Sequence, residues 1–242
     1  MDLRWEILAP YARLFVTGTW MTVQLTVIAL VFGLIAGLMI GLVTAQPQQG
    51  LKQLLRWLFK AYVGFFRGTP LFVQILLVHF AFMPVLINPS DGLLVSGEAA
   101  RELRQEHGAF LSGVLALTLN AAAYISEIVR AGIQSIARGQ VQAAQSLGMN
   151  DQQAMRLIIL PQALRRMVPP LVNESITLLK DSSLVSVMGL WEIMFLAQSY
   201  GRSAYRYMEM LITAAVIYWI LSFLLELIQA RLEKVFHGGK TR

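Results

Sequence analysis

Four ionisable residues stand in stretches that are otherwise apolar, namely Glu127, Glu174, Lys180 and Asp181. On insertion scales an ionisable side chain at the centre of a membrane helix costs about 2.5 to 3.5 kcal/mol, so such residues usually face a cavity or a partner group. Uncharged polar residues stand near them in the sequence: Asn120, Tyr124, Asn173, Ser182 and Ser183. We take all of these residues as candidates for the lining of a polar pathway.

Some of these residues also have a purely structural explanation. Glu127 and Arg130 are three residues apart, so they can form an ion pair along one helix. Lys180 and Asp181 can form an ion pair or an interface contact near the membrane edge, because about 20 helical residues after Pro161 cover roughly 30 Å. The sequence leaves these alternatives open.

The histidines and cysteines bear on metal and nucleophile chemistry. The chain has no cysteine, which excludes thiolate metal sites and a cysteine nucleophile. His79, His107 and His237 are scattered and match no metal-site spacing. The patterns His-Glu-x-x-His and Gly-x-Ser-x-Gly are also absent. We therefore expect a non-catalytic chain that binds no metal or cofactor.

The candidate pathway residues lie within or next to long apolar tracts, and the helices that these tracts form would position them. Of the 242 residues, 56% are hydrophobic and 14% charged, whereas soluble domains carry about 25% charged residues. Uncharged tracts cover residues 14–51, 68–90, 109–126 and 210–225, and about 20 apolar residues suffice to cross a membrane. Between Pro161 and Tyr200, prolines and ionisable residues interrupt one more apolar stretch, which we interpret as a broken span. The sequence predicts an all-α membrane protein with about five transmembrane helices.

The charges between the tracts predict the orientation of the chain. The segments 52–67 and 130–166 carry an excess of Lys and Arg, which the positive-inside rule places in the cytoplasm. The segment 91–106 is acidic and fits the outer side. With five spans, the N-terminus is outside and the C-terminus is cytoplasmic. The basic inner segments account for the net charge of +6, so nucleic-acid binding is not needed to explain it.

The inner segment 138–161 has the pattern of two short helices joined by a turn. Gly148 can adopt the left-handed conformation that ends the first helix, and Asn150 with Gln153 forms a capping-box pattern for the second. Pro161 then breaks or bends the chain before it re-enters the membrane. Small residues in the first helix would let another protein approach closely, although such residues also occur where a loop helix packs beneath its own bundle.

The same segment closely resembles the EAA signature of permeases in ATP-binding-cassette (ABC) importers. The residues at the positions of that signature are Gln142, Ala143, Ala144, Gly148, Ile158, Leu160 and Pro161. Gln142 replaces the usual glutamate. The stretches Phe66–Gln74, Ala123–Arg130 and Lys180–Leu184 further resemble the polar amino-acid importer permeases of the histidine, glutamine and arginine type.

This resemblance implies one permease domain over residues 1–242, placed as a multi-pass protein in the bacterial plasma membrane. The segment 138–161 would be its cytoplasmic coupling loop, with a coupling helix that contacts an ATPase. The residues implied to couple are Gly139, Gln142, Ala143, Ala144, Leu147, Gly148 and Pro161.

The resemblance also implies partners. These are a second permease subunit, identical or paralogous, two cytoplasmic ATPases that use ATP and Mg, an extracytoplasmic amino-acid-binding protein and membrane lipid. The chain has no Gly-x-x-x-x-Gly-Lys-Ser/Thr phosphate loop, which agrees with ATP hydrolysis in a partner. The candidate pathway residues offer acceptors for the ammonium group and donors for the carboxylate group of an amino acid.

A channel or an ion-coupled secondary transporter is the alternative function, since five spans with one broken span would suit either. An internal inverted repeat would favour a secondary transporter. The sequence shows no such repeat, and an odd number of spans does not divide into equal halves. Which amino acid is carried does not follow from the sequence.

Overall fold

The computed structural model describes residues 3–45 and 51–237, and every named element in that part is a helix. The first half contains η1 (Trp5–Tyr11), α1 (Ala12–Ala45), α2 (Leu51–Gly68), α3 (Leu71–Leu77), η2 (Val78–Phe82), α4 (Met83–Leu86) and α5 (Gly97–Gln134). The second half contains α6 (Arg138–Ser146), α7 (Asp151–Ala154), η3 (Met155–Ile159), α8 (Leu160–Asp181), η4 (Ser182–Met188), α9 (Ile193–Ser203) and α10 (Tyr207–His237).

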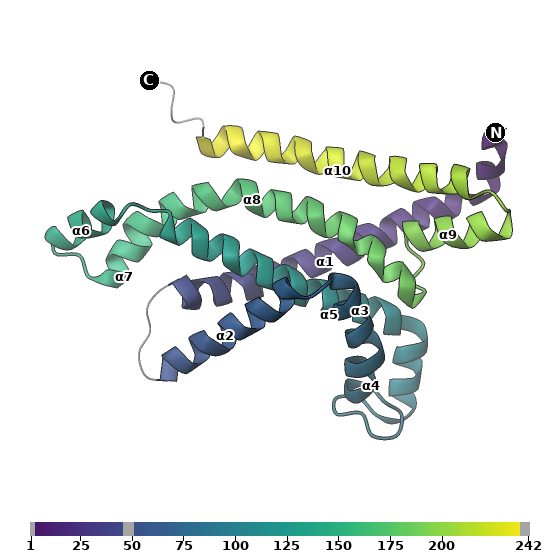
Figure 1. The fold of residues 1–242 in the computed structure, drawn as a ribbon, viewed down its shortest axis with the longest axis horizontal. Coiled ribbons are helices and arrows are strands. Elements are labelled where there is room, and N and C mark those ends of the chain that lie inside the picture. Colours follow the sequence, from purple (N-terminus) through teal and green to yellow (C-terminus); the bar gives the residue numbers. More distant parts are fainter. Residues whose placement is uncertain (1–2, 46–50, 238–242) are drawn as a thin grey trace.

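Helices α1, α8 and α10 run along the long axis of the molecule, as Figure 1 shows. Helices α3 and α4 project to one side of that axis. The N-terminal helix η1 and the C-terminal end of α10 lie at opposite ends. The α6–α7 loop lies at the same end as the last turns of α10 and the first turns of α2.

The core is organised around a close contact between α1 and α5. Gly33, Gly37 and Gly41 recur every fourth residue and therefore share one face of α1. A Cβ atom on Gly37 would lie 2.7 Å from the Cβ of Ile125, and one on Gly41 would lie 2.6 Å from the Cβ of Val129. Only glycine allows the two helices to approach this closely.

Three helices are long and apolar enough to cross a membrane: Trp5–Ala45, Gly97–Gln134 and Tyr207–Lys234. A pair bent by 110°, Gln53–Gly68 and Leu71–Leu86, adds a fourth span if it is counted as one. The second predicted span is thus shorter than expected, because Leu71–Leu86 covers only about 24 Å. The structure supports a multi-pass helical protein with three or four spans by these criteria.

The stretch between Pro161 and Tyr200 is broken, as predicted, but the break comes after Asp181 and not at the prolines. Helix α8 continues for 22 residues and contains Pro169 and Pro170 in its interior. Each proline removes one backbone donor, a loss that packing against neighbouring helices can offset in a membrane protein. The helix gives way to the 3₁₀ segment η4 only at Ser182, and the backbone turns at Gly189, where φ is 79°.

Pro161 bends the chain and does not break it. The helical conformation passes from α7 through the π-helical segment η3 into α8, where Pro161 stands in the first turn. Both a proline and a π-helical segment interrupt the regular hydrogen bonds of an α-helix, and such interruptions typically bend it. Figure 1 shows the change of direction between α7 and α8.

Candidate functional site

The α6–α7 loop has the two caps that the sequence predicts. Gly148 adopts a φ of +81°, and the backbone N–H of Met149 donates to the carbonyl of Ala144 at 3.1 Å. At the start of α7 the Asn150 side chain accepts from the Gln153 backbone, while the Gln153 side chain accepts from the Asn150 backbone, both at 2.9 Å. These contacts fix the angle between the two short helices.

The prediction of a small-residue face on α6 is wrong in one respect, because Ala143 and Ala144 point in different directions. Ala144 is 3% exposed and packs within the loop, as does Ala154 of α7. Ala143 is exposed, since neighbouring residues of a helix are about 100° apart. Leu147 is 79% exposed, which leaves it free to contact a partner.

The remaining predicted coupling residues lie at the edges of this surface. Gly139 and Gln142 are exposed, and nothing lies within 4 Å of a Cβ atom placed on Gly139. Pro161 is exposed in the first turn of α8. The exposed surface of α6 and the residue that follows it therefore includes Gln142, Ala143 and Leu147, whereas Ala144 is buried.

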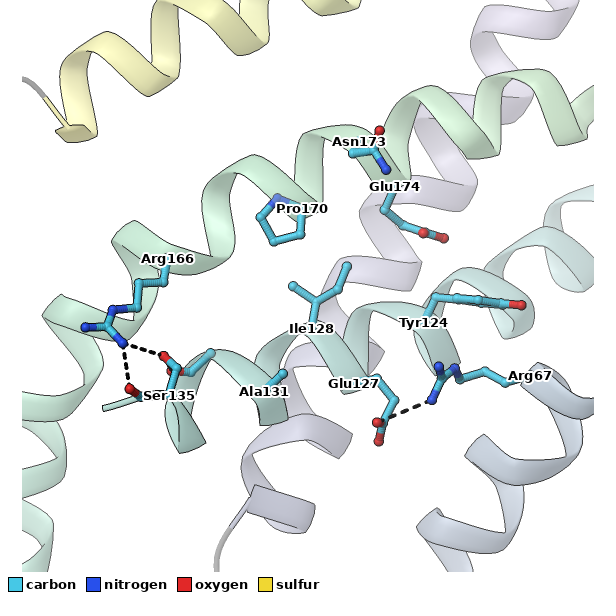
Figure 2. A pocket seen from close by; sticks show the side chains of 11 residues that line it. Arg67, Tyr124, Glu127, Ile128, Ala131, Ser135, Arg166, Pro170, Asn173 and Glu174 are labelled. Atoms are coloured by element: carbon cyan, nitrogen blue, oxygen red, sulfur yellow. Dashed lines mark hydrogen bonds and ion pairs between the residues drawn. The ribbon is translucent and has the colours of Figure 1, made fainter. Parts of the chain in front are cut away.

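A cleft of about 590 Å³ lies between α5 and α8, with Arg67 of α2 at its side. Figure 2 shows Glu174 and Asn173 projecting from α8 on one side, Tyr124 and Glu127 from α5 on the other, and Arg67 beyond them. The residues that line the cleft are Arg67, Tyr124, Glu127, Ile128, Ala131, Gly132, Ser135, Arg166, Pro170, Asn173 and Glu174.

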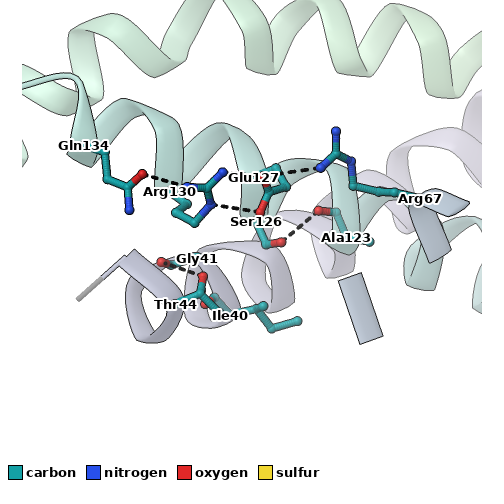
Figure 3. Close-up of polar contacts among 9 residues, drawn as sticks. All are labelled: Ile40, Gly41, Thr44, Arg67, Ala123, Ser126, Glu127, Arg130 and Gln134. Atoms are coloured by element: carbon teal, nitrogen blue, oxygen red, sulfur yellow. Dashed lines mark hydrogen bonds and ion pairs between the residues drawn. The ribbon is translucent and has the colours of Figure 1, made fainter. Parts of the chain in front are cut away.

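Two arginines share the carboxylate of Glu127. Arg130 donates from Nε to Oε1 at 3.0 Å and from Nη2 to Oε2 at 2.7 Å, so the predicted intrahelical pair is confirmed. Arg67 approaches Oε2 from α2 at 3.3 Å, and its guanidinium lies 5.5 Å from the centre of the Tyr124 ring. Figure 3 shows both arginines approaching Glu127. One negative charge is therefore surrounded by two positive charges at this side of the cleft.

Glu174 lies in the cleft in a different setting. It is half-buried on α8 and makes no hydrogen bond or ion pair within the described part of the chain. Arg166, on the same helix, donates to the carbonyl of Ser135 at 2.6 Å and to its hydroxyl at 3.1 Å, which ties α8 to the end of α5. Glu174 thus presents an unpaired acceptor, whereas Arg166 is already engaged.

Of the predicted pathway residues, Tyr124, Glu127, Asn173 and Glu174 come together in the cleft. The others lie outside it. Asn120 is buried, and its amide donates to Gln74 at 2.9 Å. The hydroxyls of Ser182 and Ser183 donate to the carbonyls of Leu179 and Lys180, which satisfies both groups locally.

Lys180 and Asp181 stand at the end of α8, outside the lining of the cleft. Lys180 is exposed and Asp181 is half-buried. In the part of the chain that the structure describes, no ion pair joins these two residues, so the structural alternative that the sequence left open is wrong in that form.

Arg67 and Arg166 are cleft residues that sequence reasoning did not single out. Both belong to the basic segments 52–67 and 130–166, which we assigned to the cytoplasmic side. The position of Arg67 next to Gly68 and Pro70, at the 110° bend, is a signal that could have separated it from the other basic residues. Within residues 3–45 and 51–237, no group of three or more His, Asp or Glu side chains could hold a metal ion.

Comparisons with known proteins identify the family. The profile described as "Binding-protein-dependent transport system inner membrane component" matches residues 33–237. The chain is 39% identical over 178 residues to the arginine transport system permease protein ArtQ of Bacillus subtilis (strain 168), which covers 74% of each chain. It is 37% identical over 220 residues to the L-cystine transport system permease protein TcyB of the same strain, covering 90% of this chain and 84% of TcyB.

A solved structure agrees with this result. The crystal structure of an amino acid ABC transporter with histidines superposes with a TM-score of 0.81 and 34% sequence identity, over 97% of this chain and 99% of that one. The likeness extends over nearly the whole fold. The chain therefore belongs to the family of binding-protein-dependent transport system inner membrane components.

Proposed function

We propose that this chain forms one half of the translocation pathway for polar or charged amino acids in an ABC importer and couples that pathway to a cytoplasmic ATPase. The observation that carries the proposal is the capped α6–α7 loop, which presents Leu147 with 79% of its surface exposed. The names of the relatives ArtQ and TcyB, which concern arginine and cystine, support amino acids as the substrate class.

The proposed topology has five spans with the N-terminus outside and the C-terminus in the cytoplasm. Helix α8 supplies the additional span, since its 22 residues cover about 33 Å although it is too polar to be recognised by hydropathy. The basic segments gather at the end that holds the α6–α7 loop and the last turns of α10, which supports a cytoplasmic position for that end.

Coupling follows from the continuity of the chain after the loop. Because the helix runs from α7 through η3 into α8, a displacement of α6 by an ATPase moves a helix that also carries Asn173 and Glu174. Closure of the ATPases on ATP would thereby change the width of the cleft. Hydrolysis would reverse the movement.

The cleft has groups that suit both charges of an amino acid. Arg67 has five N–H donors and shares a carboxylate that Arg130 already binds through two hydrogen bonds, so donors remain for a substrate carboxylate. Glu174 can accept from an ammonium group. The complete pathway would be formed by this cleft together with the corresponding cleft of the second permease subunit.

The chain is non-catalytic in this proposal, and ATP with Mg is used by the partner. The assembly consists of this subunit, a second permease that is identical or paralogous, two cytoplasmic ATPases and an extracytoplasmic amino-acid-binding protein. Residues 1–242 form a single permease domain, and residues 138–161 form the coupling loop within it.

Substitution of Leu147 tests the coupling role. Leu147→Ala removes an exposed apolar side chain, so the permease should fold normally while binding of the ATPase falls about tenfold or more, as for an interface anchor. The matched control is Leu94→Ala, because Leu94 is 74% exposed at the turn between α4 and α5. The measurements are co-purification of the ATPase and ATP hydrolysis stimulated by the loaded binding protein in proteoliposomes.

Equal ATPase recovery and stimulation in the two variants would contradict the coupling role. Uptake of labelled amino acid by the permease alone, driven by an ion gradient and independent of ATP, would instead favour a channel or secondary transporter. The same proteoliposomes distinguish these outcomes.

A further inference from the structure

A second hollow lies on the opposite side of α8 from the cleft. It has a volume of about 220 Å³ and is formed by α1, α8 and α10. Its lining is almost entirely apolar and consists of Val23, Thr26, Val27, Leu30, Ser175, Leu179, Leu221, Leu224 and Leu225. Helix α8 therefore separates a polar cleft from an apolar pocket.

The polar atoms of the pocket need no ligand. The hydroxyl of Thr26 donates to the carbonyl of Thr22 at 2.8 Å, and that of Ser175 donates to the carbonyl of Leu171 at 2.9 Å. Water is not stable in such a pocket, because an ordered water needs two to four polar partners. The occupant must be apolar.

The size of the pocket restricts that occupant further. A helix of a second copy measures about 10 to 12 Å across with its side chains, so it could cover the mouth of the pocket but not fill its interior. A single hydrocarbon chain is narrow enough. The residues that form the pocket belong to helices of a membrane protein, where acyl chains are the surrounding solvent.

Two arginines stand beyond the pocket toward the end of the molecule that holds the α6–α7 loop. Arg231 follows Leu224 by seven residues, so it lies on the same side of α10, about 10 Å farther along. Arg165 precedes Ser175 on α8 by about 15 Å. Both are exposed and have no ion-pair partner within the described residues. Their spacing from the pocket suits the separation of a phosphate group from the middle of its acyl chain.

The acidic residues of α10 do not offset the positive charges of Arg231 and Arg165. Glu226 and Glu233 lie two and nine residues after Leu224, which places them on the far side of α10 from the pocket.

We propose that the pocket formed by α1, α8 and α10 holds an acyl chain of an anionic phospholipid whose phosphate contacts Arg231 and Arg165. The bound lipid fills the space behind α8 and supports the helix that lines the cleft.

A photoreactive lipid tests this site. The complex is reconstituted with phosphatidylglycerol that carries a diazirine in its acyl chain, and labelled peptides are mapped by mass spectrometry. Labelling should concentrate around Thr26, Ser175 and Leu224. Val27→Trp should fill the pocket and reduce labelling at least fivefold. Val16→Trp is the matched control, because Val16 is equally placed on exposed α1 surface but lies outside the pocket.

A second experiment tests how much the basic residues contribute to the preference for an anionic lipid. Arg231→Gln is a surface change that leaves the fold intact, and it should reduce the preference for phosphatidylglycerol over phosphatidylcholine about fivefold, the factor that one basic residue contributes near an anionic surface. Glu226→Gln should have no such effect. Labelling spread evenly over the exposed faces of α1 and α10 would overturn the proposal. So would efficient disulfide formation between two copies of a Val27→Cys variant, since a second subunit would then cover the pocket.

Discussion

Gly148 is the residue that determines the shape of the α6–α7 loop. Its φ of +81° is unfavourable for a residue with a Cβ atom by roughly 1 to 2 kcal/mol, and more for a β-branched residue. Gly148→Val should therefore disorder the end of α6 and reduce substrate-stimulated ATP hydrolysis several-fold. Insertion of the permease should be normal, because the loop lies outside the long apolar helices.

The same position offers a matched control for this substitution. Asparagine adopts a positive φ at a smaller cost than other residues with a Cβ atom. Gly148→Asn should therefore retain most of the stimulated hydrolysis. Equal losses in the two variants would show that the presence of a side chain at position 148, and not its backbone conformation, explains the effect.

Helix α8 separates the cleft from the apolar pocket, and its faces should differ in access to water. In this naturally cysteine-free chain, Asn173→Cys and Glu174→Cys should react with a water-soluble thiol reagent. Ile176→Cys and Leu178→Cys should be protected, because these residues are 6% and 2% exposed. Reaction rates should differ at least tenfold, measured with and without ATP. Uniform rates along α8 would mean that it does not border an aqueous pathway.

The sequence predicted the individual helices better than the contacts between them. Helices α1, α5 and α10 were located from their uncharged tracts, and the caps of α6 and α7 from Gly148 and Asn150. The break in the stretch after Pro161 was predicted but its place after Asp181 was not, because a proline is locally a helix breaker and its tolerance depends on tertiary packing. Arg67 was missed as a cleft residue for a similar reason, since only the fold brings the end of α2 to Glu127.

The orientation of the whole molecule can be tested with fused reporters. Reporters placed after Lys60 and after Arg138 should be cytoplasmic, because both positions belong to basic segments at the loop end of the molecule. A reporter after Gly97, at the start of α5, should be extracytoplasmic. Cytoplasmic labelling at Gly97 would refute the proposed topology and would also remove α3 and α4 from the set of spanning segments.

The glycine contact between α1 and α5 restricts the residues that α1 can carry there. The side chains of Ile125 and Val129 lie so close to Gly37 and Gly41 that any larger residue at either glycine would force the two helices apart. Helix α10 is different, since only 6% of its most apolar window is buried. The contact between α1 and α5 is thus the closely packed part of the subunit, whereas most of the apolar surface of α10 is left exposed.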